Sequence, residues 1–171
     1  MADRLFISLW LKQWDEDLVL EAFRKLLEVF PYSARRPGVQ MVTVQPVDWS
    51  EPPSFEQHFT PGASAAAVLE AVEQFHHSDC AYQAIAWWDA GEELAQVKMI
   101  AYGPDFEGSD DEEGHIEIDL GPDIPYRASR ENLTKLVFLM HELPKKLPLR
   151  KRLLWSDSGE DVSELLAKTI H

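Results

Sequence analysis

Hydrophobic residues recur with two different periods near the start of the chain. Residues 5–11 alternate with period two, which predicts a strand, and apolar side chains on both of its faces favour an interior position in a sheet. Apolar residues at positions 18–30 recur at helical spacing behind the three acids 15–17. We therefore expect an amphipathic helix that ends near Pro31. Residues 39–47 predict a second strand, interrupted late by its proline.

The segment that follows has no period. Residues 48–61 contain three prolines and scattered aromatic residues, which predicts a long irregular loop. Thr60 and Pro61 are a typical cap and first turn, so we expect a helix that starts there and runs to about His76.

Strands and helices are both predicted in the second half of the chain. Alternation indicates a hairpin of residues 80–89 and 94–102, a half-exposed strand at 115–120 and a short final strand at 149–155. Ser129 caps a third helix, which should end before Pro144 because proline cannot continue the hydrogen-bond ladder. Asp157 or Ser158 caps a fourth.

These elements define an expected fold class. The class is α+β, with a mostly antiparallel five- or six-stranded sheet packed by about four helices. At 171 residues, the chain should form a single α+β domain over 1–171, arranged as a two- or three-layer sandwich. A doubly wound nucleotide-binding sheet is disfavoured, because no glycine-rich fingerprint follows the first strand.

Composition narrows the class of protein further. Hydrophobic residues make up 45% and aromatic residues 11%, which excludes a disordered chain. The single cysteine excludes an internal disulfide framework. No apolar stretch approaches the roughly 20 residues that a membrane helix needs, and the first residues do not form a secretory signal. We therefore expect a soluble, cytoplasmic protein that does not associate with membranes.

Charge is the strongest departure from average composition. Sixteen basic against thirty acidic residues give a net charge of −14, which disfavours binding to nucleic acid. The excess is uneven: residues 89–123 hold twelve acids and one base, whereas residues 127–152 hold eight bases and two acids. The two blocks either neutralise one another or leave an acidic patch that faces a partner.

The densest acidic segment is a candidate partner-binding surface. Its residues are Glu107, Asp110, Asp111, Glu112 and Glu113. The spacing of these acids fails the requirements of a calcium-binding EF-hand loop. A solvated connection between two strands, a contact with a protein partner and a cation site remain the alternatives, in that order.

Metal and catalytic motifs are incomplete. His76, His77 and Cys80 have no second ligand pair of the kind that zinc sites use. His141 and Glu142 begin a metalloprotease motif whose second histidine is missing. No serine-nucleophile elbow exists, and the surroundings of the cysteine match no known protease. The sequence thus supports no catalytic residue, no metal and no cofactor.

Tryptophan is abundant enough to suggest a role beyond the core. Of the six, Trp87 and Trp88 are adjacent in a predicted strand and must point to opposite faces. The one that faces away from the helices either packs under the long loop around Trp49 or is exposed as an interface anchor, and plain core packing is the alternative to a ligand contact. We place candidate ligand contacts at Trp49 and Trp88, with a pocket between the sheet and the helices.

The sequence does not determine the function, and three hypotheses follow from it. The first is a non-catalytic acidic binding protein that docks a basic protein partner, comparable in charge and size alone to immunity or inhibitor proteins. The second is a small enzyme or small-molecule-binding domain with a pocket near Trp49 and Trp88. The third is a structural subunit that dimerises through an open sheet edge. The oligomeric state is not predicted.

Overall fold

The computed structural model describes residues 4–90, 93–107, 114–122 and 129–157. They form an α+β fold built on one seven-stranded sheet in which every pairing is antiparallel. The strands are β1 (Arg4–Leu11), β2 (Val39–Pro46), β3 (Phe55–His58), β4 (Cys80–Ala90), β5 (Glu93–Tyr102), β6 (Ile116–Pro122) and β7 (Leu149–Ser156). The helices are α1 (Glu16–Val29), α2 (Ala65–Val72) with the 3₁₀ turn η1 (Glu73–Phe75), and α4 (Arg130–Lys146).

The spatial order of the strands is β3-β2-β4-β5-β6-β1-β7. The first strand of the chain therefore lies inside the sheet, between β6 and β7, as its two apolar faces predicted. Strands β3 and β7 are the two edges. The hairpin β4–β5 lies at the centre and is the longest pairing, with Ala81 opposite Tyr102 at one end and Ala90 opposite Glu93 at the other.

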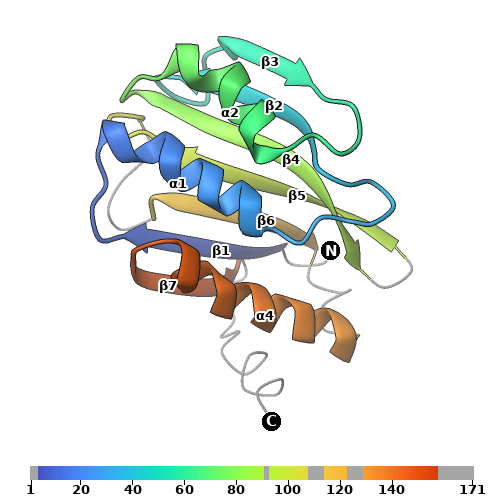
Figure 1. Ribbon diagram of the computed structural model, residues 1–171. Helices are drawn as coiled ribbons and strands as arrows, with labels where there is room; N and C mark the ends of the chain where they lie inside the picture. Colours follow the sequence, from blue (N-terminus) through green and yellow to red (C-terminus); the bar gives the residue numbers. More distant parts are fainter. Residues whose placement is uncertain (1–3, 91–92, 108–113, 123–128, 158–171) are drawn as a thin grey trace.

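Helices α1, α2 and α4 lie side by side on one face of the sheet, with α1 in the middle (Figure 1). Helix α1 is capped by the side chain of Asp15, which accepts a hydrogen bond from the amide of Asp17. Its apolar stripe packs against inward-facing residues of β1, β4 and β5 in one continuous core. The described residues thus form two layers, and the strand side chains of opposite parity face away from the helices.

The sheet is larger than the five or six strands expected. The additional strand is β3, which lies within the predicted loop 48–61. Three of its four residues are polar and exposed, so the segment has no apolar alternation that would predict a strand. Its backbone nevertheless pairs with β2 from Met41 to Val44. The prediction that this segment is wholly irregular was wrong, because an edge strand needs only a partner for its backbone.

The helices differ from the prediction in number and in two boundaries. The described residues contain three α-helices, not four; the fourth, expected after Asp157, lies outside them. Helix α2 begins after Ser64, whose hydroxyl accepts from the amide of Ala67, and not at the predicted cap Thr60. None of the described helices is long and apolar enough to cross a membrane.

Helix α4 continues through Pro144 instead of ending before it. Proline has no N–H, so the carbonyl of Met140 loses its helical partner. The guanidinium of Arg152 in β7 takes that place, with Nη1 donating to the Met140 oxygen at 2.9 Å. A side chain twelve residues away therefore satisfies the carbonyl that the proline leaves open.

Candidate functional site

Three loops meet at one end of the sheet, where β2 and β5 end and β4 begins. They are residues 47–51, 76–79 and 103–107, which we call the acidic end. Backbone hydrogen bonds join them: the amide of Val47 donates to Asp79 O (3.0 Å) and the amide of Glu107 donates to Val47 O (2.7 Å). Gly103 allows the close approach, because a Cβ there would lie 2.3 Å from the carbonyl oxygen of Ser78.

Val47 sits between the other two loops in a strained conformation. Its φ angle is +61°, in the left-handed region that β-branched residues rarely adopt. The two backbone bonds above hold it there, and its side chain is 45% exposed. Strain of this kind persists only where surrounding structure enforces it, and it is concentrated at functional sites.

The loop that follows Val47 presents an exposed tryptophan. The buried side chain of Gln45 donates to the carbonyl oxygens of Asp48 and Glu51, which fixes the loop from beneath. Trp49 is 49% exposed and stands edge-on to Phe106, with ring centroids 5.3 Å apart. Phe106 belongs to a small apolar cluster on the sheet face that points away from the helices.

The three joined loops, one of which carries Trp49, contain five carboxylates and no Lys or Arg. The acids are Asp48, Glu51, Asp79, Asp105 and Glu107. Hydrogen bonds from the hydroxyl and amide of Ser50 lower the pKa of Asp48. Asp48 therefore stays ionised at neutral pH and keeps the negative charge of this end.

The structure brings some of the predicted site residues together and separates others. Glu107 and Trp49 both lie at the acidic end. Asp110, Asp111, Glu112 and Glu113 follow Glu107 in the chain but lie outside the described residues.

Trp88 lies elsewhere. It is 1% exposed and lies in the main core on the helix side of the sheet. There its ring packs against Phe30, the residue that follows α1. Trp49 is on the opposite side, so these two tryptophans do not line a common pocket.

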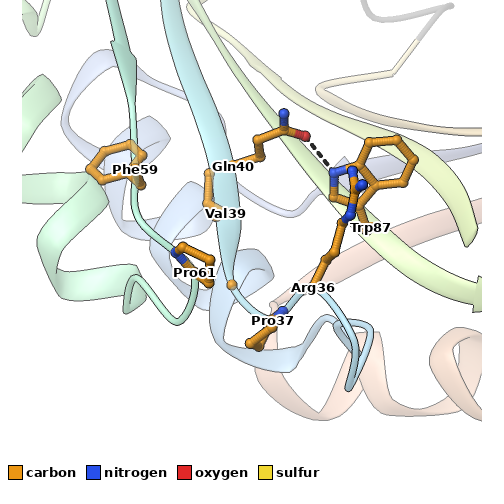
Figure 2. A pocket seen from close by; sticks show the side chains of 8 residues that line it. Arg36, Pro37, Val39, Gln40, Phe59, Pro61 and Trp87 are labelled. Atoms are coloured by element: carbon orange, nitrogen blue, oxygen red, sulfur yellow. Dashed lines mark hydrogen bonds between the residues drawn. The ribbon is translucent and has the colours of Figure 1, made fainter.

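The tryptophan that faces away from the helices is Trp87. It lines a pocket of about 280 Å³ at the other end of β2, together with Arg36, Gln40, Phe59 and Pro61. Figure 2 shows Arg36 and Trp87 on one side of this pocket and Phe59 and Pro61 on the other. We call it the Trp87 pocket.

The candidate metal and nucleophile residues have other partners. His76 hydrogen-bonds to the carbonyl oxygen of Glu16, and His77 Nδ1 lies 2.7 Å from Asp79 Oδ1. In the part of the chain that the structure describes, no group of three His, Cys, Asp or Glu side chains could hold a metal ion. Burial and the neighbouring Asp79 raise the pKa of Cys80 to about 11, which disfavours the reactive thiolate.

Several residues of the acidic end were not predicted as a group. The hairpin alone would have brought residues 76–79 close to 103–107, because its strands pair from residue 81 opposite residue 102. Asp48 and Val47 join them only through the pairing of β2 with β4, where Pro46 is opposite Cys80. That pairing spans more than thirty residues of chain, and no local pattern signals it.

Comparisons with protein-family models, with curated proteins and with solved structures found no significant match to this chain. Function is therefore argued from the chemistry of the sites themselves.

Proposed function

We propose that the protein is a non-catalytic binding protein whose acidic end docks a basic protein partner. The observation that carries the proposal is the convergence of three loops that together hold five carboxylates, no Lys or Arg, and the exposed side chains of Val47 and Trp49. Asp110, Asp111, Glu112 and Glu113 lie outside the described residues and stay part of the proposed partner contact because they are three to six positions after Glu107 in the sequence.

Charge supports a basic partner more strongly than any other. The net charge of −14 gives the protein a long-range field that accelerates encounter with a cationic surface and repels anionic ones. The acids of the acidic end concentrate that field at one place. A partner rich in Lys and Arg would form ion pairs there that weaken as salt rises.

The exposed apolar side chains supply an aromatic anchor for binding, which the carboxylates alone do not provide. Protein interfaces commonly have an aromatic anchor surrounded by polar groups, and tryptophan is enriched among the residues that dominate binding energy. Trp49 meets both conditions, because Gln45 and Phe106 hold it in place while about half of its surface stays open. Its rigidity reduces the entropy lost on binding.

The test begins with capture of partners by the immobilised full chain from an extract of its own cells, at low and at high salt. Each retained protein is then purified and titrated against four forms of the chain. These are the wild type, Trp49→Ala, the triple variant Asp48→Asn/Asp105→Asn/Glu107→Gln, and the control Glu56→Gln/Glu70→Gln/Glu73→Gln. The control removes the same number of exposed carboxylates from β3, α2 and η1.

We expect Trp49→Ala to weaken binding by about 2 kcal/mol, or about thirtyfold. The triple variant should slow association by about tenfold at low salt, and the control should change it little. A partner that binds all four forms equally well, or that binds equally at both salt concentrations, would contradict docking at the acidic end.

A further inference from the structure

The Trp87 pocket is separate from the acidic end and lies at the opposite end of β2. Three segments build it: residues 36–40, which lead into β2, residues 59–61 after β3, and Trp87 of β4. The amide of Phe59 donates to the carbonyl oxygen of Gln40, and the amide of Gly62 donates to that of Pro37, each at 2.8 Å. The walls are thus joined by backbone bonds.

The loop beneath the pocket is also fixed. Gly38 has a φ of +79°, and a Cβ at this position would lie 2.7 Å from the backbone nitrogen of Ala63. Asp89 holds the preceding residues by accepting from the Ser33 hydroxyl and from the Ala34 amide. The pocket is therefore formed before any ligand arrives, which lowers the cost of binding.

Among the described residues that line the pocket, Arg36 is the one cation, and it is pre-oriented. Its Cζ lies 4.8 Å from the centroid of the Trp87 ring, in a cation–π contact. Within the residues that the structure describes, its guanidinium forms no ion pair with a carboxylate. Its neighbour Arg35, by contrast, is paired with Asp89. In a chain with 30 acidic residues, Arg36 thus keeps its donors available for an outside anion.

The other side chains of the lining are apolar apart from the amide of Gln40. Phe59 and Pro61 face the stacked Arg36–Trp87 pair across the pocket (Figure 2), and Val39 lies between the two walls. Gln40 uses its side-chain oxygen to accept from Trp87 Nε1, which leaves its amide hydrogens free to donate. An apolar recess with a guanidinium and an amide donor at its rim suits a ligand that has an apolar body and one anionic group.

We infer that the Trp87 pocket binds a carboxylate attached to an aromatic or bulky aliphatic group. The planar guanidinium of Arg36, held on the indole, receives the carboxylate through two parallel N–H donors. The apolar body fills the space between Trp87 and Phe59. The volume of about 280 Å³ suits one such group. Two sources share this chemistry: the last residue of a peptide and a free aromatic acid.

The experiment uses the full chain and three small probes. They are N-acetyl-L-phenylalanine, its amide N-acetyl-L-phenylalaninamide, and phenylacetate. The readout is the indole N–H resonance of Trp87 in two-dimensional NMR, assigned by its loss in Trp87→Phe. Arg36→Gln tests the guanidinium, and Arg36→Lys keeps the charge without the planar fork. Arg130→Gln is the control, since it removes one exposed arginine from α4 on the helix side.

We expect the acid to shift the Trp87 resonance saturably and the amide to bind at least about tenfold more weakly. Arg36→Gln should weaken binding of the acid by a similar factor, Arg36→Lys by less, and Arg130→Gln not at all. Tighter binding of N-acetyl-L-phenylalanine indicates a peptide carboxyl terminus, and tighter binding of phenylacetate indicates a free acid.

Three results would overturn the inference. They are no saturable shift at Trp87 up to about 10 mM of either acid, equal binding of acid and amide, or unchanged binding by Arg36→Gln. Because Arg36 is exposed, an unchanged thermal unfolding midpoint shows that the variant is folded. None of these results bears on docking at the acidic end, so the two proposals stand or fall separately.

Discussion

Trp87 and Trp88 are adjacent in the chain and lie on opposite sides of the sheet. Trp88 is 1% exposed beneath the helices, where its ring lies 5.8 Å from that of Phe30. Trp87 is half-buried on the other side, with its indole nitrogen bonded to Gln40 and Arg36 stacked on its ring. The two neighbouring tryptophans therefore have different roles: Trp88 stabilises the core, and Trp87 lines a pocket.

Replacing each tryptophan should separate these roles. Trp88→Ala leaves a large cavity in the core, and we expect it to lower the free energy of unfolding by about 3–5 kcal/mol. Trp87→Ala should cost less, about 2 kcal/mol, because its ring is only partly buried and its removal leaves no closed cavity. Urea unfolding monitored by circular dichroism measures both. If Trp88→Ala does not fold, Trp88→Phe provides the comparison, and it should still cost more than Trp87→Phe. Equal costs would contradict the assignment of the two faces.

Position 47 should be one of the few at which a glycine variant of the protein is more stable than an alanine variant. At ordinary positions glycine is less stable, by about 0.5–1 kcal/mol, because it is more flexible when unfolded. The left-handed φ of +61° reverses this order, since alanine keeps the strain and glycine does not. We expect Val47→Gly to exceed Val47→Ala by about 1 kcal/mol in unfolding free energy. If Val47→Ala instead has the higher free energy of unfolding in chemical denaturation, Val47 is not held in this conformation.

Gly38 and Gly62 allow the cost of a positive φ angle to be measured separately from the cost of a steric clash with a new Cβ atom. Both have positive φ angles, +79° and +90°. A Cβ at Gly38 would lie 2.7 Å and 2.8 Å from the backbone nitrogen and oxygen of Ala63, whereas at Gly62 nothing lies within 4 Å. Gly62→Ala should therefore cost only the conformational strain of about 1–2 kcal/mol.

Gly38→Ala should cost distinctly more than Gly62→Ala, because backbone atoms cannot turn aside as a flexible side chain can. Thermal unfolding of the two variants in parallel checks the difference. Gly38→Ala should also weaken binding of N-acetyl-L-phenylalanine, since Gly38 lines the Trp87 pocket. Similar stability of the two variants would contradict the close approach of residues 38 and 63.

Local pattern was sufficient to predict β1, α1 and the β4–β5 hairpin, because each has a strong apolar period and, for α1, an acidic cap. It was insufficient where a distant residue decides the outcome. Strand β3 exists because β2 offers it a partner, and α4 passes Pro144 because Arg152 reaches Met140. Neither partner is visible in the segment itself.

The candidate sites show the same division. Adjacent tryptophans in a strand face opposite ways, and Trp88, the predicted ligand contact, is the one that lies buried beneath the helices. The apolar residues Tyr82, Ala84 and Ala86 share the face of Trp88 and are fully buried, which points to Trp87 as the accessible one. Glu107 was predicted as a partner contact, and its loop lies beside Trp49. The two loops are close because β2 pairs with β4, and this pairing cannot be predicted from the periodicity of the residues.

Cys80 should react slowly with alkylating reagents. Burial, a hydrogen bond to Asp79 and the charge of that carboxylate raise its pKa from 9.0 to about 11. The thiolate fraction at pH 8 is then roughly a hundredfold lower than for the unshifted thiol, and the rate falls with it. We expect iodoacetamide to label the native protein at least this much more slowly than the urea-unfolded protein. Asp79→Asn should accelerate labelling, and rapid labelling of the native wild type would contradict the shift.

Asp89 should make stability depend on pH in the acid range. Its carboxylate accepts from the Ser33 hydroxyl, from the Ala34 amide at 3.0 Å and from Arg35 Nε at 3.2 Å. The bond from Ser33 is the main cause of its lowered pKa in the folded state. The unfolded carboxyl, near its ordinary value of about 3.9, takes up a proton first as the pH falls. The stabilisation is thus fully present above about pH 4 and is lost as the pH falls through the folded pKa.

Asp89→Asn removes the charge at every pH, so the difference in unfolding free energy between wild type and variant isolates this group. The difference should favour the wild type at neutral pH and narrow below about pH 4. Glu56→Gln is the control, because the side chain of Glu56 is exposed on β3 and its carboxylate forms no hydrogen bond or ion pair with the described residues. A wild-type advantage that stays constant down to about pH 2.5 would contradict the mechanism. Because Asp89 also anchors the loop that carries Arg36, binding of N-acetyl-L-phenylalanine should weaken in Asp89→Asn even where the protein remains folded.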